Sequence, residues 1–345
     1  MTVSPNRSPS YLDWARVGRS GNWWYLFGAA LIIAVWVIAQ SVILTAGVAA
    51  SGGDLLDPNA FDNGGSQTWV DTAITLVSFL PFFIGTLLVV KFIHGRPARS
   101  IITPYSNYNF RLFIIGVLAW GGTVVVVAAI TLALRPDGFK WNYDPKTFWP
   151  AFLTVLLFVF FQTTAEELFF RGYLLQWISK ATRSALLLGV ISGVLFTLPH
   201  LANPELADLR GAGFLVGTIP YFAIGFALGF VSVRSGTIEM AIGAHFINNL
   251  LAATLIGANN SALGSSTLWI DTTPSATETA LTSVISVVVF IALTWRAHGS
   301  GDLQPIPAAP DETVAERPAA GWFPDPNGQA TYRYWDGTQW TEHTS

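Results

Sequence analysis

Three groups of polar residues combine the carboxylate, imidazole and amide side chains that can activate water for hydrolysis. They are Glu166 and Glu167 with Arg171, Phe196 with His200, and His245 with Asn249. Each group lies within a long apolar stretch, where an ionisable side chain costs about 2.5–3.5 kcal/mol on insertion scales. Such residues indicate a functional site unless they only join helices to one another.

Helical spacing gives the two neighbouring glutamates different roles. Glu167 and Arg171 are four residues apart with the carboxylate on the N-terminal side, the favourable order for an ion pair. On a helix Glu166 points about 100° away from Glu167, on the side of Gln162. We therefore expect an internal pair to neutralise Glu167 and to leave Glu166 free to act as a general base.

The second group follows a stripe of small residues. Gly189, Gly193, Phe196 and His200 share one helical face. A Gly-x-x-x-Gly pair allows a second helix to approach closely, so we expect His200 to project toward that helix.

The third group supplies hydrogen-bond donors. His245 and Asn249 lie one turn apart on one face, whereas Asn248 points elsewhere. Glu166, helped by His200, can deprotonate a water that attacks a peptide carbonyl. His245 and Asn249 can then stabilise the oxyanion, an effect typically worth about 3 kcal/mol per donor.

A zinc ion is the alternative way to activate water here. Two imidazoles and one carboxylate, from His200, His245 and Glu166, can bind zinc and leave one position open for water. The glutamate route requires no cofactor, whereas the zinc route requires a divalent metal. The sequence leaves both routes open. The chain has no Cys, which excludes disulfides and thiolate-bound metals.

The elements that position these residues are membrane helices. Hydrophobic residues make up 52% of the 345 residues and charged residues only 11%, against roughly 25% charged in soluble domains. A membrane-spanning helix needs about 20 apolar residues. The sequence predicts eight such spans, at residues 24–45, 70–90, 113–134, 148–177, 186–206, 214–233, 238–256 and 280–295.

Basic residues in the connections predict the orientation. The N-terminal segment 1–23 and the second connection are rich in Arg and Lys, whereas connections 51–68 and 257–279 contain neither. Since cytoplasmic loops are enriched in Lys and Arg, we expect both termini to be cytoplasmic. The transmembrane helical domain then covers residues 24–296, in a bacterial plasma membrane.

The C-terminal region has a different composition. Residues 297–319 are rich in Gly, Pro and Ala and are typical of a flexible linker. In residues 320–345, Asn327-Gly328 and Asp336-Gly337 are hairpin-turn signals on either side of a predicted strand at 331–335. We expect a small Trp-rich β-meander whose aromatic side chains either form its core or contact a partner protein.

The three polar groups together resemble the motifs of the CAAX prenyl endopeptidase and bacteriocin-processing family (CPBP, also called Abi proteins). The likeness covers roughly residues 147–257. It implies an all-α, polytopic intramembrane protease whose cavity faces the cytoplasm. It also implies that Glu166 and His200 activate water, that His245 and Asn249 stabilise the oxyanion, and that Glu167, Arg171 and Phe196 support them. Older descriptions of the family as metalloproteases have given way to a mechanism without an essential metal.

Two other functions are compatible with the same residues. Buried Glu and His also occur in proton-coupled transporters, and a catalytically silent scaffold or immunity protein could keep the fold. For the protease we expect a peptide or membrane-protein substrate and the lipid bilayer as partners. The net charge of −3 argues against a nucleic-acid partner.

Overall fold

The computed structural model describes residues 9–51, 68–207, 209–258, 266–303 and 320–345. Contacts divide the chain into two compact units. Pro5–Pro305 forms the helical unit, and the second unit contains the C-terminal strands.

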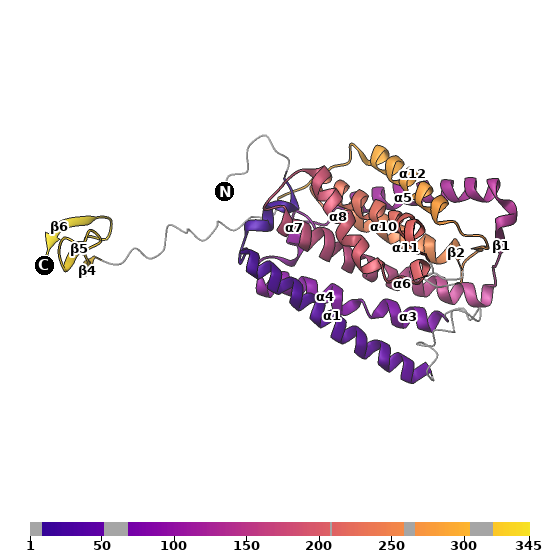
Figure 1. The fold of residues 1–345 in the computed structure, drawn as a ribbon, viewed down its shortest axis with the longest axis horizontal. Helices are drawn as coiled ribbons and strands as arrows, with labels where there is room; N and C mark the ends of the chain where they lie inside the picture. Colours follow the sequence, from indigo (N-terminus) through magenta and orange to yellow (C-terminus); the bar gives the residue numbers. More distant parts are fainter. Residues whose placement is uncertain (1–8, 52–67, 208, 259–265, 304–319) are drawn as a thin grey trace. The chain divides into compact units, whose positions relative to one another are not determined.

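Helices build nearly all of the first unit (Figure 1). In chain order the helical elements are η1 (Tyr11–Arg16), α1 (Asn22–Ser51), α3 (Trp69–Val77), α4 (Leu80–Leu88), η3 (Val89–Ile93), η4 (Ala98–Ile101), α5 (Phe110–Leu134), η5 (Pro136–Gly138), α6 (Pro145–Glu167), η6 (Leu168–Leu174), α7 (Leu175–Ile178), α8 (Ala185–His200), α9 (Pro204–Ala207), α10 (Gly211–Ser235), α11 (Glu239–Thr254) and α12 (Ala276–Thr294).

The expected all-α membrane architecture is confirmed. Each of the eight predicted spans falls largely on helical elements, with short breaks at residues 78–79 in the second span and 201–203 in the fifth. Within the described part of the chain, six of these are long and apolar enough to cross a membrane, and the longest is Pro145–Ile178. The predicted spans at 186–206 and 238–256 are shorter, because α8 and α11 have 16 residues each.

Local sequence explains where the helices that carry the polar groups begin and end. Asp144 caps α6 by accepting the backbone N–H of Lys146, and Pro145 occupies the first turn, where its missing N–H is harmless. Ser184 caps α8 in the same way. Helix α10 ends at Gly236, whose φ of 77° is the left-handed conformation that glycine adopts readily.

Helices α8 and α10 are in close contact through glycines, as the small-residue stripe predicts. A Cβ atom on Gly225 of α10 would lie 2.9 Å from the Cα of Gly193. A Cβ atom on Gly193 would lie 2.8 Å from the ring of Phe222. Side chains larger than hydrogen would force these helices apart, so the glycines set the position of α8 and of the His200 at its end.

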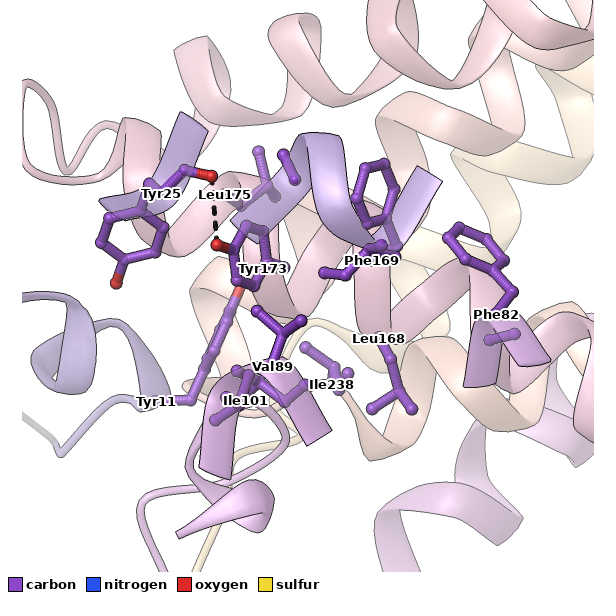
Figure 2. Packing of buried hydrophobic residues seen from close by; sticks show 14 of the residues in the cluster. Tyr11, Tyr25, Phe82, Val89, Ile101, Leu168, Phe169, Tyr173, Leu175 and Ile238 are labelled. Carbon is purple, nitrogen blue, oxygen red and sulfur yellow. Dashed lines mark hydrogen bonds between the residues drawn. The ribbon is translucent and has the colours of Figure 1, made fainter. Parts of the chain in front are cut away.

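The largest apolar core surrounds the end of the long segment α6–η6–α7. Figure 2 shows Tyr11, Val89, Leu168, Phe169 and Tyr173 packed within it. Tyr11 belongs to η1, so part of the N-terminal segment is a buried element of the bundle. Its hydroxyl donates to the carbonyl oxygen of Arg171 at 3.0 Å, directly behind one of the polar groups.

A small sheet lies at the end of the helical unit opposite α7 (Figure 1). Its strands are β1 (Phe139–Trp141), β2 (Ile256–Ala258) and β3 (Trp269–Asp271). The central strand β3 runs antiparallel to β1 and parallel to β2. Arg135 reinforces this end through ion pairs with Asp271 and Glu278.

The C-terminal unit is the predicted three-stranded meander. Strands β4 (Gly321–Pro324), β5 (Tyr332–Trp335) and β6 (Trp340–Thr344) pair antiparallel in that order. Gly328 and Gly337 have φ values of 65° and 97°, as the two hairpin turns require. The Trp335 and Trp340 rings meet edge to face with centroids 5.4 Å apart, so aromatic packing holds the sheet together.

Candidate active site

His245 of α11 lies between the two adjacent glutamates of α6. Its Nδ1 is 2.7 Å from Glu167 Oε1, and its Nε2 is 3.7 Å from Glu166 Oε2. All three side chains are buried. The sequence did not predict that one imidazole would contact both glutamates, because that contact depends on how α11 packs against α6.

The ion pair between Glu167 and Arg171 is present as the spacing predicts. Arg171 Nη1 is 2.7 Å from Glu167 Oε1, and both side chains are 0% exposed. Arg171 Nη2 also donates to the carbonyl oxygen of Gly225 on α10 at 3.3 Å. Because an unpaired buried charge would cost several kcal/mol, this pair supports the fold and supplies His245 with a fixed carboxylate.

The backbone changes character immediately after the glutamates. Residues Leu168–Leu174 form the π-helix η6 instead of continuing the α-helix of α6. Such π-helical turns occur frequently at functional sites. This widening was not predicted, since the apolar residues around it fit an α-helix equally well.

Glu166 keeps one carboxylate oxygen available. Its Oε1 accepts a hydrogen bond from Gln162 Nε2 at 2.6 Å, one turn earlier on α6. Its Oε2 is buried and has no hydrogen-bond partner among the residues that the structure describes. That oxygen can therefore take a proton from a water molecule, which is the task of a general base.

Asn249 joins the same network through Gln162. Asn249 Nδ2 donates to Gln162 Oε1 at 3.1 Å, and Asn249 Oδ1 accepts from Asn248 Nδ2 at 3.0 Å. Trp120 Nε1 in turn donates to Asn248 Oδ1 at 3.0 Å. Asn248 thus contacts Trp120 of α5 and also donates to the neighbouring Asn249, so it joins the network although helical spacing predicts that it points elsewhere.

His200 lies at the end of α8 and faces α10, as expected. Its Nδ1 donates to the carbonyl oxygen of Phe196 at 2.7 Å, so in the neutral ring Nε2 is the nitrogen that can accept a proton. Its ring stacks on Tyr221 of α10, with centroids 4.8 Å apart and an interplanar angle of 29°. The sequence offers no signal for Tyr221, since aromatic residues are common throughout the spans.

Phe196 connects His200 to the glutamate cluster. Its ring centroid is 4.5 Å from that of His200 and 5.5 Å from that of His245. The Arg171 guanidinium lies 4.4 Å from the same centroid, in cation–π distance. Phe196 is 2% exposed, so its ring is a buried spacer that three polar side chains share.

A second polar cluster lies beyond Tyr221, in the segment that follows α8. The Tyr221 hydroxyl donates to Glu205 Oε1. Asn203 Nδ2 donates to the Tyr221 oxygen at 3.1 Å and to Glu205 Oε1 at 3.3 Å. These bonds hold the ring on which His200 stacks.

The arrangement does not form a ready metal site. Throughout the described ranges, no group of three or more His, Cys, Asp and Glu side chains is placed to hold a metal ion. Of the trio considered for zinc, Glu166 and His245 approach one another, while His200 is turned to Phe196 and Tyr221. We therefore derive no catalytic step through a metal.

Comparison with known proteins agrees with this geometry. A family model described as type II CAAX prenyl endopeptidase Rce1-like matches residues 147–251, which contain all three polar groups. An uncharacterized protein, YyaK of Bacillus subtilis (strain 168), is 32% identical over 252 residues, covering 72% of this chain and 82% of that protein. The chain belongs to the Rce1-like family. Membership implies an integral membrane protein with CAAX-type intramembrane protease activity.

The C-terminal unit has a separate relationship. Residues 320–345 match a family described as a protein of unknown function, DUF2510. No solved structure matches the chain.

Proposed function

We propose that this Rce1-like protein is an intramembrane endopeptidase that uses Glu166, together with His200, to activate water. The observation that carries the proposal is the buried Glu166 Oε2, which lacks a hydrogen-bond partner within the described structure and lies 3.7 Å from His245 Nε2. A base and a neighbouring hydrogen-bond donor can act together, the first on a water and the second on the carbonyl that it attacks.

In the first step Glu166 Oε2 takes a proton from water, and the resulting hydroxide oxygen bonds to the carbonyl carbon of the substrate. We assign to His200 Nε2, the ring nitrogen that is not bonded to Phe196, the role of assisting this proton transfer. The protonated Glu166 then passes its proton to the departing amine nitrogen as the carbon–nitrogen bond breaks. The products are a carboxylic acid and an amine, and Glu166 returns to its ionised form.

His245 and Asn249 stabilise the negative charge that develops on the carbonyl oxygen. His245 Nδ1 faces the carboxylate of Glu167, so Nε2–H can donate only when the ring carries both protons. A protonated His245 and Arg171 together balance the charges of Glu166 and Glu167.

The substrate is a peptide or membrane protein whose cleavage site reaches a cavity open to the cytoplasm. We place both termini in the cytoplasm and the helical unit in the bacterial plasma membrane, because the Arg- and Lys-rich connections alternate with connections that lack them. We also propose that the protein is related to the bacteriocin-processing Abi proteins.

Comparison of membrane peptides from cells that carry native protein or the Glu166→Gln variant tests the activity. Glu166→Gln keeps the size of the side chain and removes the base, so at least one cleavage product should disappear. Glu278→Gln is the matched control, because Glu278 pairs with Arg135 at the far end of the helical unit. Unchanged peptides in Glu166→Gln cells would instead favour a catalytically silent scaffold. Proton-coupled flux in liposomes would favour a transporter.

We also propose that the reaction needs no metal, because Glu166, His200 and His245 do not converge as ligands. Cleavage should persist after treatment with EDTA and 1,10-phenanthroline. Loss of cleavage that added Zn²⁺ restores, with no such response in a Glu166→Gln variant, would contradict this part of the proposal and favour the metalloprotease-like route.

For the C-terminal unit we propose a protein partner. Trp322, Tyr332 and Trp340 are 49%, 45% and 38% exposed, and exposed aromatic residues are typical of contact surfaces. A photo-crosslinking residue at position 322 should capture one defined protein in cells, whereas the same residue at position 342, at the edge strand, should capture less. Equal capture at both positions would count against an aromatic contact.

A further inference from the structure

Five side chains form a single hydrogen-bonded chain that ends at Glu166. In order, each one donating to the next, they are Trp120, Asn248, Asn249, Gln162 and Glu166. The four donor–acceptor distances are 3.0, 3.0, 3.1 and 2.6 Å. The chain crosses from α5 through α11 to α6, so it joins three helices at the site.

The two ends of this chain give it a unique direction. The indole of Trp120 can only donate, and an ionised carboxylate can only accept. Trp120 therefore requires the oxygen of the Asn248 amide, which turns the nitrogen of Asn248 to Asn249. The same rule repeats at Asn249 and Gln162, so none of the three amides can turn over without breaking two bonds.

This direction matters because Asn249 carries two N–H groups on one nitrogen. One donates to Gln162 Oε1, and the other is left to donate elsewhere. An inverted amide would present its oxygen, which would repel the oxyanion instead of binding it. Burial strengthens the constraint, because Gln162 is 5% exposed and Trp120 is 4% exposed, and water cannot easily replace a lost bond.

We propose that Gln162 is a positioning residue that couples the water-activating carboxylate to the oxyanion-binding amide, and that Trp120 sets the orientation of that amide from outside the site. The inference rests on the proposed function of Glu166 and Asn249. Gln162 also holds the Glu166 carboxylate in place, since it donates to Oε1 at 2.6 Å.

The decisive experiment does not require a substrate. Dicyclohexylcarbodiimide modifies carboxyl groups in apolar surroundings, and mass spectrometry of the full-length protein in detergent can follow the rate at which Glu166 is labelled at pH 7. Gln162→Met keeps the length of the side chain without the amide, so the Glu166 carboxyl loses a hydrogen bond and its labelling rate should rise about tenfold, the equivalent of one hydrogen bond to a charged group. Gln40→Met is the matched control, because Gln40 of α1 donates to Ser78, outside the site.

The activity arm uses a fluorogenic farnesylated CAAX peptide. Gln162→Met and Trp120→Phe should each lower kcat about tenfold or more and leave KM within about twofold, because the affected groups act on the reacting atoms. Trp36→Phe is the control for the indole: Trp36 Nε1 is buried without a hydrogen-bond partner in the described ranges, so removing its N–H should leave kcat unchanged.

A Glu166 labelling rate in Gln162→Met equal to that in Gln40→Met would overturn the inference, whatever the activity. So would a kcat for Trp120→Phe equal to that of Trp36→Phe. A wild-type protein that leaves the peptide intact, together with a raised labelling rate in Gln162→Met, would count against the substrate and support the coupling of Gln162 to Glu166.

Discussion

Two buried glutamines on the same membrane segment make opposite kinds of contact. Gln162 bonds to two side chains, Glu166 and Asn249. Gln176 donates to the carbonyl oxygens of Tyr11 and Ser100 at 2.8 and 2.7 Å, and its oxygen accepts from Arg96. Backbone carbonyls and the permanently charged Arg96 hold elements in place, whereas a carboxylate such as Glu166 can change its charge during a reaction.

The difference separates a structural cluster from a chemical one. The Gln176 cluster fastens η1, η4 and α7 together where the N-terminal segment enters the bundle. The Gln162 cluster includes a carboxylate oxygen, Glu166 Oε2, that accepts no hydrogen bond from the described residues. Buried polarity alone therefore does not identify an active site in a membrane protein; the kind of partner does.

The largest effect should follow from breaking the ion pair beside the site. Arg171→Met leaves Glu167 buried without its guanidinium, and removing one partner of a buried pair typically costs about 3–5 kcal/mol. We expect a sharp fall in the thermal unfolding midpoint in detergent. The double variant Glu167→Gln, Arg171→Met should recover part of this loss, and equal midpoints for the single and double variants would show that the charge is not the cause.

Gln176→Met should mainly destabilise the protein. It leaves two carbonyl oxygens and one Arg96 N–H without a bond, and an unsatisfied buried group typically costs about 1–3 kcal/mol. The unfolding midpoint should fall further than in Gln162→Met, while kcat per folded molecule stays within about twofold of wild type. If Gln176→Met lowers kcat as much as Gln162→Met does, the distinction between the two clusters fails.

The stability of the region around the Gln176 cluster should also depend on pH, through His94. Its Nδ1 faces the carbonyl oxygen of Arg19 and its Nε2 the Tyr173 hydroxyl. Burial, reinforced by the Arg96 charge, lowers the pKa of His94 from 6.5 to about 4. The unfolded chain therefore takes up this proton at a higher pH than the folded protein does.

The stabilising contribution is thus complete above about pH 6.5 and is lost as the pH falls toward 4. Thermal midpoints at pH 7 and pH 4.5 should differ more for wild type than for His94→Phe, which cannot be protonated. Identical pH dependence in the two proteins would show that His94 is not the group responsible.

The smallest effect should come from Tyr11→Phe. Tyr11 links the two clusters, because its hydroxyl donates to the Arg171 carbonyl and its own carbonyl accepts from Gln176. The substitution removes one hydrogen bond to the Arg171 carbonyl, worth about 1 kcal/mol, without touching the side chains of the site. Tyr25→Phe is the matched control, because it removes a comparable bond to the Ala15 carbonyl at 3.0 Å. Both variants should lose similar stability and keep kcat; a fall in kcat for Tyr11→Phe alone would mean that η1 also controls the site.

The helices and the short-range contacts can be predicted from the order of residues alone. Apolar runs predict the spans, because a membrane helix must satisfy its backbone internally. Four-residue spacing predicts the Glu167–Arg171 pair and the contact between Gln162 and Glu166, since helix geometry alone places these side chains together. The C-terminal meander follows from turns that need glycine.

Contacts between side chains on different helices depend on how those helices pack. The packing of α5, α6, α8, α10 and α11 places His245 between Glu166 and Glu167. It also stacks Tyr221 on His200 and lets Trp120 orient the three amides. Packing depends on the shapes of whole helix faces, and sequence spacing within one helix carries no information on the neighbour that it meets.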